Sequence, residues 1–347
     1  MNVRRHVGAA VALVVCLSAL AVLGLSQSSL SADGPRAGAA VSTGESTATE
    51  TSKASLEGLS YKRVSNPTGT KVVDAKGKEV ARFTDTARTA VLQGKERTLE
   101  EPGKTDARVT STSYVRVMPQ PYTQGAEKKA WFKEWLAKSI KDKSPDVLEV
   151  GTQYFHGAEN VYDENGLRIA GDADFGPEKG AGGEKKGSDF NDFLEIKVAF
   201  PDEEDDRPEK SQKNALDPSG FVRMVYGYRL GYPMYGKNPK GEALQRGVAG
   251  LHDNGPGVLL ARDTGTTPPL ETLEKQLLPG DILMFATDMQ PNLNHSAIYM
   301  GRDDRGNHRF MSSREAVNGP TMGDFAAPSI IDGHDLFAAN FRAVRRI

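Results

Sequence analysis

The first part of the chain alternates short apolar runs with turn residues. Runs rich in β-branched and aromatic residues occur, in order, at 70–74, 79–83, 89–93 and 109–118. A turn signal at 75–77 separates the first two runs. Runs of this length, separated by glycine and aspartate, are typical of β-strands joined by tight turns. This pattern predicts a small β-rich module over residues 56–121.

An amphipathic helix is expected after the module. Pro119 and Pro121 end the β pattern, and residues 127–140 then carry apolar side chains at helical spacing. These side chains are Trp131, Trp135, Leu136 and Ile140. Two tryptophans on one helix can form a platform for carbohydrate, but packing in a core or against a neighbouring domain is favoured. We therefore expect residues 122–145 to connect two folded units through this helix.

A second unit is expected over residues 146–347. It holds a polar, glycine-rich insertion at 160–188 and an acidic run at 202–206. Acidic clusters can bind calcium, but the spacing of this run fits no calcium loop. A solvated surface segment is therefore the favoured interpretation of the run.

The clearest helix start in the second unit lies at Asp217 and Pro218. Aspartate is a good N-cap, and proline suits the first helical position because its missing N–H would be unpaired there anyway. Apolar residues follow at helical spacing: Phe221, Val222, Val225 and Tyr228. This apolar face predicts a helix that is buried in a core.

Three strand-like segments follow this helix. A turn at 278–281 leads into the apolar run 282–285. The next two runs lie at 294–301 and 308–312. A helix followed by an antiparallel meander is an α+β arrangement, and we expect this fold class for the second unit.

The N-terminus has the layout of an export signal. Arg4 and Arg5 precede an uncharged apolar stretch at 7–25, and small and polar residues follow it. This predicts a signal peptide over residues 1–31, or an uncleaved membrane anchor, because the stretch is nearly long enough to span a bilayer. Residues 32–55 have almost no large apolar side chains and are expected to form a flexible linker. The protein is therefore expected to be secreted or associated with the cell envelope, outside the cytoplasm.

Composition narrows the chemistry that the chain can perform. The 44 Lys and Arg residues are balanced by 46 Asp and Glu residues, so there is no basic field to hold nucleic acid, which is not an expected partner. The only cysteine is Cys16, in the apolar stretch, so the rest of the chain has no disulfide, no thiolate metal site and no cysteine nucleophile. The histidines show no metal-ligand spacing, and neither a metal nor another cofactor is expected.

Several short motifs together resemble the NlpC-type (papain-like) cell-wall cysteine peptidases. That family has Asp-Cys-Ser-Gly at the start of a buried helix, Pro-Gly-Asp before one strand and histidine at the head of the next. The corresponding segments here are 217–220, 279–281 and 295–301. Segments 151–154 and 341–346 are similar to the opening and closing segments of such domains. The resemblance implies a papain-like domain in which a helix packs on an antiparallel sheet.

The resemblance also implies a catalytic site that lacks its nucleophile. The family's cysteine falls at Pro218, its base at His295, and the residue that orients the base at Ser312, where histidine is common. The chain is thus degenerate at the catalytic cysteine, since proline has no nucleophilic atom. Ser219 is a poor substitute, because one residue along a helix turns the side chain by about 100°.

Four residues are candidates for substrate binding on the same resemblance. Asp217 and Ser219 flank the nucleophile position, and Tyr154 and His156 lie in a segment that matches the family's groove. For His156, the alternative is a place in the core or in a loop. For His295, the alternative to a retained ligand-binding role is a polar residue that its neighbours satisfy at a strand end.

Three functions are compatible with these observations. The first is a pseudoenzyme, an exported NlpC-like protein that binds peptidoglycan stem peptides or a cell-envelope protein without cutting them. The second is an active peptidoglycan endopeptidase with a non-standard nucleophile. The third is a structural envelope module that binds no muropeptide. The retained motifs and the lost thiol favour the first.

Overall fold

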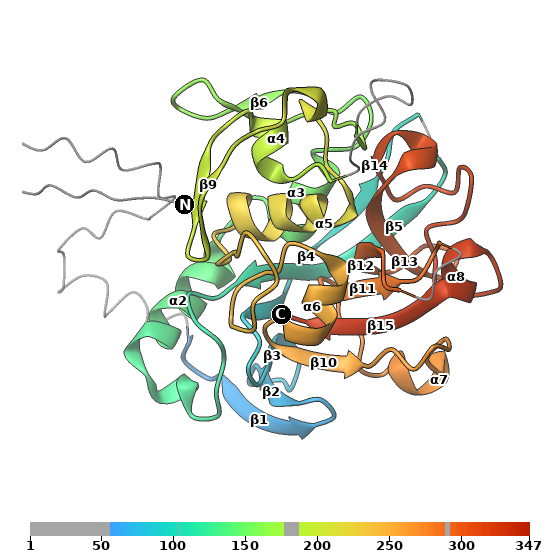
Figure 1. The fold of residues 1–347 in the computed structure, drawn as a ribbon. Helices are drawn as coiled ribbons and strands as arrows, with labels where there is room; N and C mark the ends of the chain where they lie inside the picture. The colour runs from blue at the N-terminus through green and yellow to red at the C-terminus, as the bar shows by residue number, and fades with distance from the viewer. Residues whose placement is uncertain (1–55, 104, 177–186, 289–291) are drawn as a thin grey trace, which may run out of the picture. The chain divides into compact units, whose positions relative to one another are not determined.

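A computed structural model describes residues 56–103, 105–176, 187–288 and 292–347 of the chain (Figure 1). The signal peptide or anchor and the linker that the sequence predicts lie outside these residues. Within them, helices occur together with sheets whose paired strands are antiparallel, which confirms the predicted α+β class. None of the described helices combines the length and the apolar character needed to cross a membrane.

The β-rich module forms a five-stranded antiparallel sheet in simple meander order. Its strands are β1 (Ser60–Ser65), β2 (Thr68–Val73), β3 (Glu79–Thr84), β4 (Thr89–Glu100) and β5 (Arg108–Val117). The last four strands confirm the four predicted runs. The sequence pattern missed β1, whose mostly exposed, charged residues give no apolar alternation.

Helix α2 (Ala130–Lys141) packs on this sheet and follows a short 3₁₀ turn, η1 (Ala126–Lys128). Its Phe132 and Leu136 are fully buried, and both tryptophans, Trp131 and Trp135, are partly buried against the same cluster. The predicted packing role of the tryptophans is confirmed. Ile140, by contrast, is 38% exposed and contributes nothing to that core.

The segment from 146 to 212 consists of short elements. They are α3 (Val147–Thr152), the hairpin of β6 (Val161–Tyr162) and β7 (Arg168–Ala170), α4 (Phe190–Leu194), the pair β8 (Val198–Phe200) and β9 (Glu203–Asp206), and η2 (Lys210–Gln212). Asp146 and Glu149 form a reciprocal capping box at the start of α3. The acidic run forms β9, and its exposed Asp205 pairs with Lys197 and Arg207, as a solvated surface segment would.

The predicted helix is present as α5 (Pro218–Val222), but it continues as a π-helix, η3 (Arg223–Arg229). Phe221, Val222 and Val225 are buried as predicted, whereas Tyr228, the fourth residue of the predicted face, is only partly buried against the same cluster. Three short elements follow this helix in the chain: α6 (Val248–Asn254), β10 (Val258–Ala261), which is an edge strand of the second large sheet, and α7 (Leu270–Leu273).

A six-stranded antiparallel sheet follows, in the order β10-β15-β11-β12-β13-β14. The remaining elements are β11 (Ile282–Phe285), β12 (His295–Arg302), β13 (His308–Arg314), η4 (Glu315–Val317), β14 (Gly319–Thr321), α8 (Leu336–Asn340) and β15 (Phe341–Arg346). In Figure 1, β15 runs between β10 and β11. The three predicted strands are confirmed as β11, β12 and β13.

The two faces of this sheet belong to different hydrophobic clusters. Ile298 and Met300 of β12 pack in one cluster with Phe221 of α5. Ala297 and Tyr299 alternate with them and pack in the other cluster, among aromatic side chains near α8. Helix α5 therefore lies on one face of β12 and β13.

The five-stranded sheet contributes to the first of these clusters. Val91 and Val115 pack in it together with Ile282. The backbone N–H and the hydroxyl of Thr89 both donate to the carbonyl oxygen of Ile347, at 2.7 and 2.5 Å. The two segments that the sequence separates into a module and a second unit thus share buried side chains.

Candidate functional site

The start of α5 has the predicted caps. Asp217 is the N-cap residue, and its Oδ1 accepts a hydrogen bond of 2.6 Å from the backbone N–H of Gly220. Pro218 is buried at the first helical position, where its missing N–H costs nothing. The position that the resemblance assigns to a nucleophile therefore carries a residue that fits the helix and offers no reactive atom.

Gly220 is required by a close backbone crossing. A Cβ at this position would lie 2.1 Å from the carbonyl oxygen of Ser188 and 3.0 Å from the Cα of Asp189. The segment before α4 thus passes directly over the first turn of α5. This contact gives the glycine of the motif a structural reason that is independent of catalysis.

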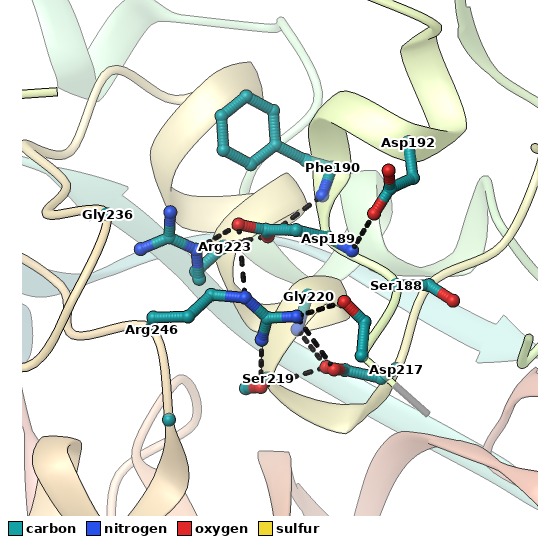
Figure 2. A network of polar contacts seen from close by, with 12 residues as sticks. Ser188, Asp189, Phe190, Asp192, Asp217, Ser219, Gly220, Arg223, Gly236 and Arg246 are labelled. Atoms are coloured by element: carbon teal, nitrogen blue, oxygen red, sulfur yellow. Dashed lines mark hydrogen bonds and ion pairs between the residues drawn. The ribbon is translucent and has the colours of Figure 1, made fainter. Parts of the chain in front are cut away.

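The guanidinium of Arg246 holds the cap residues in a polar network, which Figure 2 shows. It donates to Oδ2 of Asp217 at 3.0 Å and to Oγ of Ser219 at 2.8 Å. The Ser219 hydroxyl in turn donates to Asp217 at 2.8 Å. Both substrate-binding candidates at the helix start are therefore engaged within the protein.

A buried ion pair extends the network into the core. Nε of Arg223 lies 2.8 Å from Oδ2 of Asp189, and both side chains are less than 5% exposed. Nearby, burial raises the pKa of Asp192 to about 6, although its carboxylate accepts from the backbone N–H groups of Glu209 and Asp189. Sequence reasoning missed this cluster; the one signal for it was a single arginine inside an apolar helical run.

His295 is the first residue of β12 and is buried. Its ring packs against Phe285 and Phe337, with centroids 5.8 and 5.1 Å away. Burial, reinforced by the charge of Arg314, lowers the pKa of His295 to about 3, while the nearby Asp217 carboxylate acts in the opposite direction. The imidazole is therefore neutral, and its Nε2 has no hydrogen-bond partner among the described residues.

Ser312 does not orient this imidazole. Its hydroxyl is fully buried on β13, and its Oγ makes no hydrogen bond with any described residue. The expected contact between Ser312 and His295 is thus not formed. The ring contacts of His295 also lie with the aromatic cluster, on the sheet face opposite to the one that α5 covers.

Tyr154 lies in the core and not at a groove, which corrects the expectation for this residue. Its side chain is fully buried, and its hydroxyl donates to the carbonyl oxygen of Ile169 at 2.6 Å and accepts from Arg229 at 3.0 Å. Burial raises the pKa of Tyr154 to about 12. A ligand has no access to this side chain.

His156, two residues along, is at the surface. Its Nδ1 lies 3.2 Å from Oδ2 of Asp172, and 61% of its side chain is exposed. It lines a cavity of about 310 Å³ together with Glu101 and parts of the segment 316–325. Of the sequence candidates, His156 is the one that borders this cavity, and no residue of α5 or β12 lines it.

The described residues contain no group of three or more His, Cys, Asp or Glu side chains that could hold a metal ion. Comparison of the chain with family models, with curated proteins and with solved structures finds no match.

Proposed function

We propose that this chain is an exported, non-hydrolytic protein with an NlpC-like, papain-like fold, which binds peptidoglycan stem peptides or a cell-envelope protein. The observation that carries the proposal is the start of α5. Pro218 stands there in place of a nucleophile, inside a helix start that is properly capped and closely packed. Such a site retains the fold but has lost the reacting atom, and fold and reacting atom are separable features of a protein.

The surrounding groups do not replace the missing thiol. The Ser219 hydroxyl is held by Asp217 and Arg246 and so has no imidazole to accept its proton. His295 is a weak base, because its pKa is lowered to about 3. A general base is most effective when its pKa lies near the working pH, so these groups favour binding over hydrolysis.

The motif at 279–281, which resembles the family's Pro-Gly-Asp, has a structural role in this chain. Gly280 adopts a positive φ of 90°, and Asp281 is buried in a two-pronged ion pair with Arg346 of β15. The motif thus ties β11 to the closing strand. These charge-assisted hydrogen bonds give the motif a structural role that does not depend on catalysis.

The purified protein should release no muropeptides from insoluble peptidoglycan, in contrast to a cell-wall hydrolase that serves as positive control. His295→Ala should leave this result unchanged, as should the matched variant His334→Ala at an exposed histidine. Reproducible cleavage that His295→Ala abolishes and His334→Ala does not would overturn the proposal and establish an active hydrolase.

Binding is tested separately by co-sedimentation with insoluble peptidoglycan and by capture of envelope proteins. We expect the protein to sediment with peptidoglycan, or to retain a specific envelope protein, in a saturable manner. Failure of both experiments, with the protein folded, would leave only the structural envelope module.

A further inference from the structure

The cavity beside His156 has the size and the lining of a small-molecule binding site. It lies between the end of β4, two residues that flank the β6–β7 hairpin (His156 and Ala173) and the segment that runs from η4 past β14. Its volume of about 310 Å³ is at the lower end of the range for small-molecule pockets, roughly 300–1,000 Å³. Small side chains and backbone form much of its wall: Ala173, Ala316, Gly319, Pro320 and Gly323.

Glu101 supplies a fixed acceptor in this wall. Glu101 is the residue directly after β4, and it is only 3% exposed. Its Oε2 accepts from the hydroxyl of Thr321 at 2.6 Å and from the N–H of Met322 at 3.0 Å. Glu101 also lines the cavity, and its other oxygen, Oε1, makes no hydrogen bond with the described residues. A carboxylate that is held in place by two hydrogen bonds thus forms part of the cavity wall.

The charge of Glu101 is compensated by a neighbouring cation. The Arg314 guanidinium lies close enough for the Glu101 carboxylate to raise its pKa, although burial lowers that pKa more strongly. Because the Glu101 carboxylate already has a cationic neighbour, the site favours a neutral hydrogen-bond donor over a cation. A hydroxyl group satisfies this condition.

An exposed aromatic ring borders the same cavity. Phe325 is 69% exposed, more than any other large hydrophobic side chain among the described residues. A pocket that combines an apolar face with a few fixed polar groups selects ligands with both features. A sugar ring has them, because its C–H face packs on an aromatic ring while its hydroxyls donate hydrogen bonds.

We propose that this cavity binds a neutral carbohydrate, with a hydroxyl of the sugar donating to Glu101 Oε1 and the sugar ring covering Phe325. The site shares no residue with the start of α5 or with His295, although His156, a substrate-binding candidate from the sequence, borders it. Sugar binding here and the lack of hydrolysis proposed above are tested by separate measurements.

The test is titration of the folded protein with N-acetylglucosamine, its β-1,4-linked dimer and glucose, followed by saturation-transfer NMR and calorimetry. Putrescine serves as a cationic probe. We expect saturable binding of at least one sugar and no saturable binding of putrescine. Binding should weaken at least tenfold in Phe325→Ala and remain unchanged in Tyr162→Ala, a control at another exposed aromatic residue.

Glu101→Gln tests the hydrogen bond between the sugar hydroxyl and Glu101 directly. If the glutamine oxygen keeps the hydrogen bonds to Thr321 and Met322, its NH₂ group faces the cavity, and an acceptor becomes a donor. Sugar binding should then weaken at least tenfold while the thermal midpoint stays near that of the wild type. No saturable sugar binding by the wild type, binding of putrescine alone, or full binding by Phe325→Ala would each overturn the proposal.

Discussion

A buried imidazole remains neutral when protonation would place a charge among aromatic rings. His295 is in this situation, between Phe285 and Phe337, with the positive charge of Arg314 nearby. Its pKa of about 3 in the folded chain lies below the ordinary value of 6.5. The unfolded chain therefore binds the proton more readily, and His295 reduces stability progressively as the pH falls from about 6.5 towards 3.

His295→Phe should remove this pH dependence, because phenylalanine can pack against the same two rings without titrating. Between pH 7 and pH 5, the wild type should lose about 2 kcal/mol of unfolding free energy that the variant keeps. Urea unfolding at both pH values measures the difference. Equal losses in the two proteins would show that His295 titrates normally in the fold.

Gly220→Ala should destabilise the protein by about 3 kcal/mol, because the new methyl group would meet the carbonyl oxygen of Ser188 and neither backbone can move easily. Gly187→Ala is the matched control, since its methyl group would meet nothing closer than 3.9 Å. Urea denaturation of both variants provides the comparison. Similar stabilities for the two would contradict the close crossing at α5.

At the scale of single residues, the sequence predicts interactions between neighbouring residues but not those between distant ones. The caps Asp217 and Pro218 are correct because capping depends on neighbouring residues only. Tyr154 and His156 look equivalent in the sequence, but one is in the core and the other at the surface. That difference depends on distant packing, which a local pattern does not contain. The same holds for Ser312, whose missing contact involves another strand.

At the scale of elements, the helix that begins at Pro218 shows how a buried charge is accommodated. Arg223 opens the π-helical segment and is 1% exposed, with its guanidinium paired to Asp189 in the capping segment of α4. The pair fixes α4 against η3 through charged hydrogen bonds. The cost of burying both charges makes the pair sensitive to the loss of either partner.

Arg223→Met should therefore cost about 3–5 kcal/mol of unfolding free energy, because Asp189 would keep a buried and less compensated charge. Combining it with Asp189→Asn should recover part of that loss. Arg207→Met, at an exposed ion pair with Asp205, should leave the stability nearly unchanged. A small effect of Arg223→Met in thermal and urea unfolding would show that the buried pair is unimportant.

Elements with strong patterns were predictable, and those set by tertiary contacts were not. Strands β2 to β5 and β11 to β13 follow from their apolar runs. Strand β1 was missed because it is exposed and pairs with β2 alone. The π-helical continuation was missed because a helical apolar spacing does not distinguish the two kinds of helix.

At the scale of the whole described molecule, a buried cluster joins the two large sheets. Arg346 of β15 makes two hydrogen bonds of 2.7 Å to Asp281 and one of 2.9 Å to Thr84 at the end of β3. None of these pairs was predictable, because their partners are 65 and 262 residues apart and no local pattern connects them. Pairing of this kind favours a single cooperative unit.

Asp281→Asn should therefore weaken both sheets together, by about 3–5 kcal/mol. Both tryptophans of the chain lie on α2, so their fluorescence reports on the five-stranded sheet, whereas circular dichroism reports on the whole. We expect the two signals to shift by the same amount. Glu100→Gln, at an exposed ion pair with Arg108, is the control that should shift neither. Separate transitions would indicate independent folding units.

The position of β15 has a consequence for how the protein is made. This strand lies between β10 and β11, although every other strand of the sheet precedes it in the chain. The ribosome therefore synthesises all other strands before the one that joins β10 to the rest of the sheet. Until then the edge of β11 that β15 covers in the folded sheet has no partner, and this edge is open to pairing with another strand.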